Sequence, residues 1–140
     1  MPTVIAFDYG TRRIGVAIGE TEVGIPHPLS VIEAESNDAR YAAIGAVLAT
    51  WHPERCVVGL PFKTDGTEHD MTRRARRFAQ RLRGRFGIKV DLVDERYTST
   101  DAAIDLGAAG ASTAATERSL DAVAACAILS AWFDQLEKEA

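Results

Sequence analysis

Three carboxylates stand at positions that local secondary structure does not require. Asp8 directly follows the apolar run Val4–Phe7, and Glu95 comes two residues after Val90–Val93, a segment that is predicted below to be a strand. Asp121 interrupts an alanine-rich apolar segment in the last quarter of the chain. Because burying an unpaired carboxylate is costly, three such placements call for a common explanation.

The chemistry that these three side chains share is the binding of a divalent cation. Carboxylates that converge without a basic partner repel each other, and their pKa values rise. A divalent cation removes that conflict, and oxygen ligands without a Cys or His cluster favour Mg²⁺ or Mn²⁺ over Zn²⁺. Such ions activate water for phosphodiester hydrolysis. Asp8, Glu95 and Asp121 are therefore predicted to be the catalytic, metal-binding residues of a nuclease.

Each carboxylate also has a purely structural explanation. Asp8 could begin a turn, Asp94–Arg96 could form a surface ion-pair group, and Asp121 could be the negative charge favoured in the first turn of a helix. The three together, at meeting points that one topology predicts, favour the catalytic interpretation.

Five short apolar runs predict the strands of a sheet. The first two are joined by a short connection, which makes them antiparallel neighbours, and Pro26 and Pro28 place the third near an edge. The fourth run resembles a strand buried on both faces of a parallel sheet, and right-handed crossovers would add the fourth and fifth strands in parallel. We expect an α/β fold in a single domain over residues 1–140, with a mixed five-stranded sheet (an antiparallel meander plus two parallel strands) flanked by helices. The predicted strands are Thr3–Phe7, Ile14–Ile18, Leu29–Ile32, Cys56–Leu60 and Val90–Val93.

Helical spacing and capping residues predict the segments that connect and follow these strands. The C-terminal ends of parallel strands share one edge of an open sheet, so the first, fourth and fifth strands side by side would bring Asp8 to Glu95. Alanines in the last helix would let it press close to the sheet and add Asp121. The predicted helices run from Ser36–Asp38 to about Trp51, from an N-cap at Asp70 to Phe86, over Thr100–Leu106 and over Thr116–Leu136.

The basic residues are concentrated in one strip, although the net charge is −4. Half of the 16 Lys and Arg residues lie between Arg73 and Lys89, without an Asp or Glu among them. A charged helix face is usually only solvated, but the lack of acidic partners favours contact with a nucleic-acid backbone. The arginines taken as contacts are Arg73, Arg74, Arg77 and Arg81.

Other basic residues adjoin the predicted carboxylates. Arg12, Arg13 and Arg96 could hold a phosphate, or one of them could neutralise the carboxylates in the resting protein. Lys63 and Thr64 precede a helix N-terminus, where an anion is well placed.

Composition limits the remaining possibilities. The two cysteines form no disulfide framework or metal spacing, the N-terminus has no signal-peptide pattern, and no apolar run reaches the ~18 residues of a membrane span. We expect a cytoplasmic protein without membrane partners. His27, His52 and His69 show no ligand spacing, and both tryptophans, Trp51 and Trp132, are expected in the core.

Five segments resemble the successive motifs of the YqgF/RuvX family, in the same order and over nearly the whole chain. They are DYGTRRIGVAIG, VVGLPFKTDGTE, RARRFAQRL, DERYTST and LDAVAACAIL. The resemblance implies an RNase H-like fold related to RuvC-type Holliday junction resolvases. The acidic metal-binding positions of the family match Asp8, Glu95 and Asp121. Gly10, which has no side chain, would let a phosphate approach the backbone closely.

Two segments depart from the family pattern. Members often carry a lysine shortly before the last aspartate, where this chain has Thr116–Ser119, so a phosphate contact there would fall to Arg118. The loop reads Phe62–Thr64 where Leu-Asn-Met is more frequent.

The resemblance implies a nuclease that matures the 5′ end of pre-16S rRNA. The alternatives are a Holliday junction resolvase, which would need a symmetric dimer, and a non-catalytic nucleic-acid-binding factor. DYGT also resembles a phosphate loop of actin-like ATPases, but those need two such domains and this chain has room for one. We expect a nucleic-acid partner, pre-rRNA or branched DNA, and a monomer or homodimer.

Overall fold

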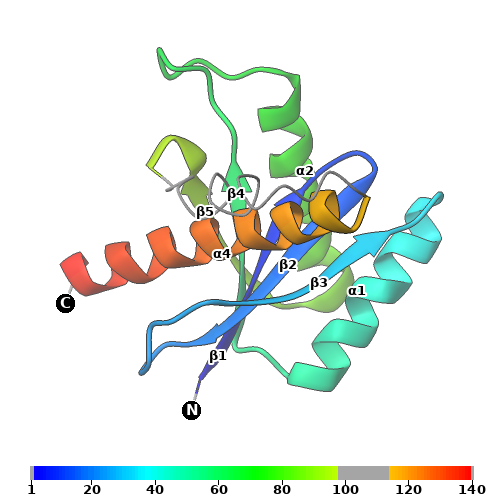
Figure 1. Ribbon diagram of the computed structural model, residues 1–140, viewed down its shortest axis with the longest axis horizontal. Coiled ribbons are helices and arrows are strands. Elements are labelled where there is room, and N and C mark those ends of the chain that lie inside the picture. The colour runs from blue at the N-terminus through cyan, green and yellow to red at the C-terminus, as the bar shows by residue number, and fades with distance from the viewer. Residues whose placement is uncertain (1, 98–113, 140) are drawn as a thin grey trace.

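The computed structural model describes residues 2–97 and 114–139, which form one sheet with helices on both sides (Figure 1). The sheet has the strand order β3-β2-β1-β4-β5. The strands are β1 (Thr3–Tyr9), β2 (Arg13–Glu20), β3 (His27–Glu33), β4 (Arg55–Leu60) and β5 (Lys89–Asp94). The helices are α1 (Asn37–Trp51), α2 (Asp70–Phe86) and α4 (Ala114–Glu139), with a 3₁₀ turn, η1, at Glu95–Tyr97.

The strand pairing confirms the predicted mixed sheet. β1 pairs with β2, and β2 with β3, in antiparallel register, whereas β1–β4 and β4–β5 are parallel. The first, fourth and fifth strands are therefore neighbours, as the meeting of Asp8 and Glu95 requires. The predicted helix Thr100–Leu106 lies outside the described residues.

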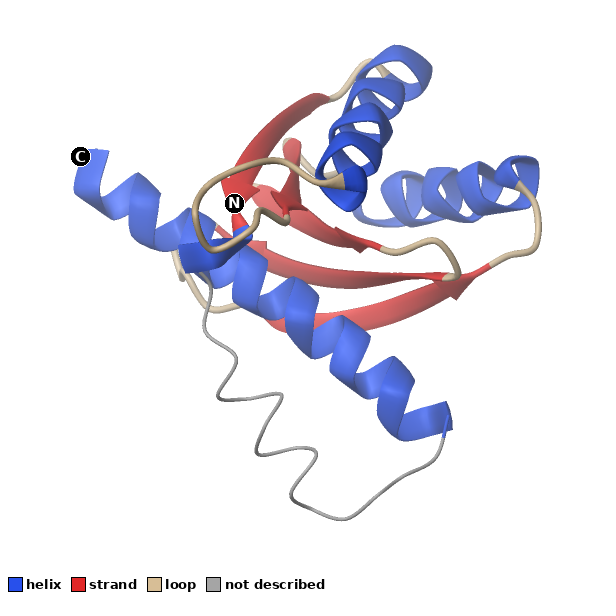
Figure 2. Ribbon diagram, turned by 90° about the horizontal axis from the view of Figure 1, so that it is seen from above, coloured by secondary structure: helices blue, strands red, loops and turns tan. Residues whose placement is uncertain are grey.

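The two faces of the sheet carry separate cores. Figure 2 shows α4 on one side and α1 and α2 on the other. The α1/α2 face is filled by large side chains, among them Phe7, Ile44 and Phe78. The α4 face begins with Val4 and Ala6 of β1 and includes several residues of α4 itself. Since side chains alternate along a strand, Asp8 belongs to the α4 face.

Two side chains from the sheet fasten the second half of α4. Trp132 Nε1–H donates to Asp91 Oδ2 at 2.9 Å, and Arg55 donates to the same oxygen at 2.8 Å. Trp132 is buried, as predicted. Trp51 is 46% exposed at the end of α1, so its predicted place in the core is wrong.

The capping residues agree with the sequence at two of three sites. Ser36 caps α1, and Gly87 in the left-handed conformation ends α2. The N-cap of α2 is His69 and not Asp70, because His69 Nδ1 accepts from Met71 N–H.

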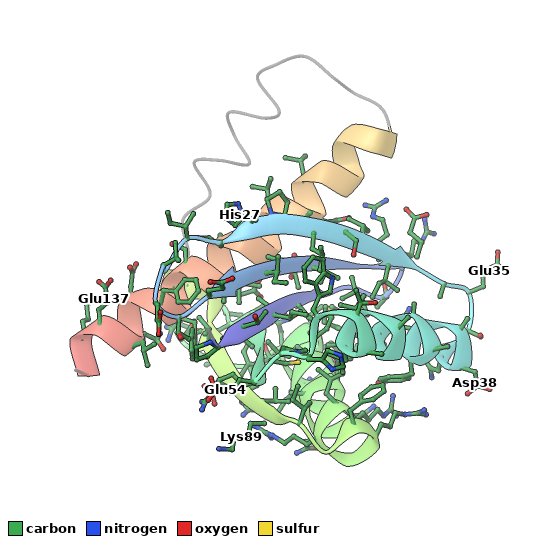
Figure 3. The ribbon with its side chains drawn as sticks, turned by 90° about the horizontal axis from the view of Figure 1, so that it is seen from below. His27, Glu35, Asp38, Glu54, Lys89 and Glu137 are labelled. Atoms are coloured by element: carbon green, nitrogen blue, oxygen red, sulfur yellow. The ribbon has the colours of Figure 1, made fainter. Side chains whose placement is uncertain are left out.

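The direction of the parallel strands distinguishes the two ends of the sheet. In Figure 3, Glu54 and Lys89, at the starts of β4 and β5, lie at the opposite end of the sheet from Glu35 and Asp38, which come after β3 in the chain. The C-terminal ends of β1, β3, β4 and β5 share this second end, here called the active edge. None of the described helices is long and apolar enough to span a bilayer.

Candidate active site

Asp8 lies at the active edge with a glycine on each neighbouring strand. Asp8 is paired with Gly15 of β2. On the other side the register pairs Phe7 with Val58 of β4, so the next residue, Gly59, lies beside Asp8. Neither glycine covers Asp8 with a side chain, and glycine within a strand often marks the close approach of another group.

Asp121 reaches this point because the backbone of α4 lies against Gly15. A Cβ atom at Gly15 would be 2.0 Å from the carbonyl oxygen of Asp121, so only glycine fits. The buried Ala122 and Ala125 keep α4 close to the sheet. The close approach predicted from the alanines is confirmed.

Glu95 approaches Asp8 from the other side. It begins η1 directly after β5, and its Cγ lies 2.9 Å from where a Cβ of Gly59 would be. Gly15 thus makes room for the helix that carries Asp121, and Gly59 makes room for Glu95. The sequence prediction does not include these two glycines, although their position inside apolar strands was the available signal.

The three carboxylates act on one another electrostatically. Burial, with a smaller contribution from the charge of Asp121, raises the pKa of Asp8 to about 6. Burial, followed by the charges of Asp8 and Asp94, raises the pKa of Glu95 to about 7. Asp8 is therefore within electrostatic reach of both other predicted ligands, and a nearby cation would favour their ionised forms.

Asp121 has a basic partner. Arg13 Nε–H donates to Asp121 Oδ2 at 2.6 Å, and the two side chains are 32% and 29% exposed. Of the two roles considered for Arg13, the structure shows neutralisation of a carboxylate. Within residues 2–97 and 114–139, no three His, Cys, Asp or Glu side chains are arranged to hold a metal ion as they stand.

Arg40 of α1 fixes the turn between β1 and β2. This buried side chain of α1 donates to the carbonyl oxygen of Thr11 at 2.6 Å. Gly10 is required by the turn itself, since a Cβ there would lie 2.5 Å from the carbonyl oxygen of Arg13. The predicted approach of a phosphate is thus not needed to explain Gly10. Arg12, in the same turn, is exposed and lines an open cleft.

Arg96 connects the carboxylate edge to the loop after β4. Its guanidinium binds both oxygens of Asp94 at 2.6–3.1 Å and lies 5.5 Å from the ring centroid of Phe62. Hydrogen bonds from Arg96 lower the pKa of Asp94. Arg96 therefore has internal partners, and these hold the turn that carries Glu95.

The loop from Pro61 to His69 is itself folded into a turn. Lys63 N–H donates to the carbonyl oxygen of Thr67 at 3.0 Å, and Asp65 accepts from both the N–H and the hydroxyl of Thr67. The side chains of Lys63 and Thr64 remain exposed beyond the end of β4. Their contact with a phosphate stays a prediction.

The seven arginines of α2 divide into two groups. Four have partners within the protein: Arg73 with Asp70, Arg76 with Glu68, Arg83 with the carbonyl oxygen of Val90, and Arg85 with the ring of Tyr41. The other three are exposed and form no ion pair with any described residue: Arg74, Arg77 and Arg81. Arg118 lies on α4, but its side chain is outside the described part, so its phosphate contact stays a prediction.

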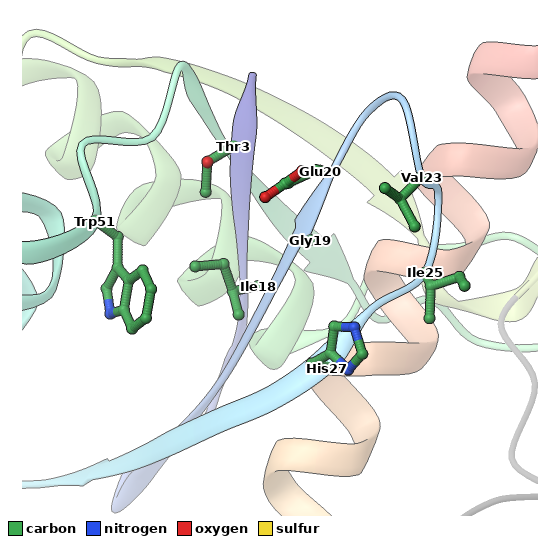
Figure 4. A pocket seen from close by; sticks show the side chains of 8 residues that line it. All are labelled: Thr3, Ile18, Gly19, Glu20, Val23, Ile25, His27 and Trp51. Carbon is green, nitrogen blue, oxygen red and sulfur yellow. The ribbon is translucent and has the colours of Figure 1, made fainter. Parts of the chain in front are cut away.

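An apolar hollow of about 280 Å³ lies at the other end of the sheet, near the start of β1. Figure 4 shows Trp51, Ile18, Ile25 and His27 around it. It holds none of the predicted catalytic residues. The exposure of Trp51 follows from its place at the rim of this hollow.

Comparison with known proteins identifies the family. A family model described as RuvX, Holliday junction resolvase, matches residues 2–135. The chain belongs to the RuvX family. A relative from Dechloromonas aromatica is 52% identical over 134 residues, covering 96% of this chain and 92% of the relative. One from Pasteurella multocida is 46% identical over 132 residues, with 94% of each covered, and both are named "Putative pre-16S rRNA nuclease".

Solved structures confirm the RNase H-like fold of this RuvX chain. RuvC of Thermus thermophilus in complex with a Holliday junction substrate aligns with a TM-score of 0.60 at 18% identity, covering 100% of this chain and 98% of that one. The fowlpox virus Holliday junction resolvase aligns with a TM-score of 0.54 at 12% identity, covering 99% of both chains. At such low identity the likeness concerns the fold.

Proposed function

We propose that this RuvX-family protein is a Mg²⁺- or Mn²⁺-dependent endonuclease that processes the 5′ end of pre-16S rRNA in the cytoplasm. The observation that carries the proposal is the meeting of Asp8, Glu95 and Asp121 at one edge, where two glycines make room for them. The names of the relatives support pre-16S rRNA as the substrate.

The donor chemistry of the three carboxylates fits a divalent cation. All are oxygen donors, and the raised pKa values of Asp8 and Glu95 reflect burial and crowding that a cation would relieve. Asp8 and Glu95 would hold the ion, and Asp121 would join them after exchanging its bond to Arg13. When bound, such an ion stabilises charge on the phosphate and activates water.

The basic groups at the active edge then serve the substrate. Once released from Asp121, the Arg13 guanidinium faces the same edge and neutralises the scissile phosphate. Arg12, with Arg118 as predicted from the sequence, contacts the strand beside it, and Lys63 and Thr64 hold a phosphate near the N-terminus of α2. Arg96 positions Glu95 through Asp94 and Phe62.

Resolution of four-way DNA junctions is the second candidate function. The description of the matching family and the fold shared with RuvC favour it. It requires two coordinated cuts and hence a homodimer, whereas RNA processing is possible for a monomer.

The test is Mn²⁺-dependent cleavage of a labelled panel by the wild-type protein and Asp8→Asn in parallel. The panel contains a leader-like single-stranded RNA, single-stranded DNA and a four-way junction. We expect cleavage of the RNA and a roughly thousandfold loss in the variant, since metal-assisted stabilisation is worth several kcal/mol. Asp70→Asn, an exposed carboxylate on α2, is the matched control and should retain activity.

Each contrary result has a definite meaning. Equal cleavage by wild type and Asp8→Asn would overturn the catalytic assignment. Preference for the junction would favour resolution over RNA processing. Binding without any cleavage would leave only a nucleic-acid-binding factor.

A further inference from the structure

The helix α2 runs away from the active edge on the far side of the sheet from α4. Its first turn is fastened at the end of β4, where the hydroxyl of Thr72 donates to the carbonyl oxygen of Pro61. Its last turn is fastened near the start of β5, where Arg83 donates to the carbonyl oxygen of Val90 at 2.6 Å. The helix therefore leads from the carboxylate edge to the opposite end of the sheet.

Three arginines form a row along the outer surface of this helix. Arg74, Arg77 and Arg81 follow the spacing i, i+3, i+7, which places them on one side of α2, next to the face that Ala75, Phe78 and Leu82 bury. All three are exposed. At 1.5 Å per residue the row is about 10 Å long, which matches about three phosphates of a stacked strand.

The row differs from other arginines of α2 in its lack of acidic partners. Arg73 and Arg76 have acidic partners, at Asp70 and Glu68. The row has no acidic partner among the described residues, in a protein with a net charge of −4. A localised positive strip on an acidic protein attracts a polyanion to that strip alone.

We propose that Arg74, Arg77 and Arg81 bind the phosphate backbone of the nucleic-acid strand that flanks the cleaved bond. This rests on the proposed nuclease function. The strand leaves the carboxylates, crosses the exposed Lys63 and Thr64 at the active edge, and continues along α2. The row contacts phosphates only, so it favours long substrates without regard to base sequence.

The matched variants are two double substitutions on the same helix. Arg77→Gln with Arg81→Gln removes two charges from the row, and Arg76→Gln with Arg85→Gln removes two charges that have internal partners. Binding of a long single-stranded RNA is measured by fluorescence anisotropy across a salt series without divalent cations. Thermal melting verifies that both variants fold.

We expect the row variant to lower the slope of log affinity against log salt by about 1.4, and the affinity at ~0.1 M salt by roughly 20-fold. The control should change affinity less than about threefold, since exposed pairs of this kind contribute little. With Mn²⁺ present, cleavage of an RNA of about four nucleotides, too short to reach the row, should be equal in all three proteins.

The outcomes distinguish a failure of the proposed row from a failure of the proposed nuclease function. An equal loss of RNA affinity in the two variants, or no loss in either, would contradict the proposed binding of phosphates by the row. Cleavage of the short RNA would still support the nuclease function. A loss of affinity in the row variant alone, together with no cleavage of RNA by any of the proteins, would support phosphate binding by the row and contradict the nuclease function.

Discussion

The two faces of the sheet differ in the size of the side chains that pack on them. The α1/α2 face packs large groups such as Phe7, Phe78 and Leu82 into a continuous core. The α4 face uses glycine and alanine next to Asp8, and there the backbone of α4 touches the sheet. The difference shows that large side chains stabilise one face, whereas the lack of a side chain at Gly15 and Gly59 lets Asp121 and Glu95 approach Asp8 on the other.

The largest effect is expected when one methyl group is added to the α4 face. Gly15→Ala would place Cβ 2.0 Å from the carbonyl oxygen of Asp121, so α4 must move. We expect the free energy of unfolding to fall by about 3 kcal/mol and nuclease activity to be lost with it. Urea denaturation and cleavage assays measure the two effects.

Gly84→Ala is the control on α2. Nothing lies within 4 Å of a Cβ at Gly84, so the same change should stabilise the protein by up to about 1 kcal/mol. If Gly15→Ala were as stable and active as the wild type, the close approach of α4 to β2 would be wrong.

A second prediction concerns the pH dependence of stability. Folding raises the pKa values of Asp8 and Glu95 to about 6 and about 7, so between about pH 4 and pH 7 the native state binds more protons than the unfolded state. The free energy of unfolding of the metal-free protein should therefore fall as pH rises from 6 to 8, by about 2 kcal/mol.

The source of this pH effect can be located by substitution. Asp8→Asn should be more stable than the wild type at pH 8 but not at pH 4, whereas Asp70→Asn on α2 should follow the wild-type curve. Mn²⁺ at pH 8 should recover the lost stability of the wild type. A wild-type curve that rises from pH 5 to pH 8 would contradict the crowding of these carboxylates.

The smallest expected effect is that of Arg13 on metal affinity. Because Arg13 holds Asp121, Arg13→Gln frees this ligand and should tighten Mn²⁺ binding about fivefold, measured by calorimetry. Arg12→Gln removes the same charge one residue away and should have less effect, since Arg12 is exposed. Equal effects of the two variants would mean that only net charge matters.

The sequence predicts the carboxylates and the sheet because both leave local signals. Asp8 directly follows an apolar run, and Glu95 comes two residues after a segment rich in Val and Leu, a composition that is typical of strands. The order of the strands can then be predicted because short, right-handed connections allow few topologies. The cap of α2 is missed because an imidazole acceptor at His69 is not among the usual capping groups.

Pairings between side chains are harder to predict than elements. Seven arginines look alike in the sequence, and only their distances from Asp70, Glu68, Val90 and Tyr41 separate those with partners from those without. The choice of Arg13 as partner of Asp121 likewise depends on where α4 crosses β2. Such choices depend on contacts between segments remote in sequence.

The position of α4 also has a consequence for the timing of activity during synthesis. Asp8 and Asp121 are more than a hundred residues apart in sequence, and they meet only where α4 lies on Gly15. A nascent chain emerges from the ribosome N-terminal end first, so the sheet can form well before α4 docks. An incomplete chain therefore lacks one of the three proposed metal ligands, so the proposed nuclease site would be complete only after the final helix is in place.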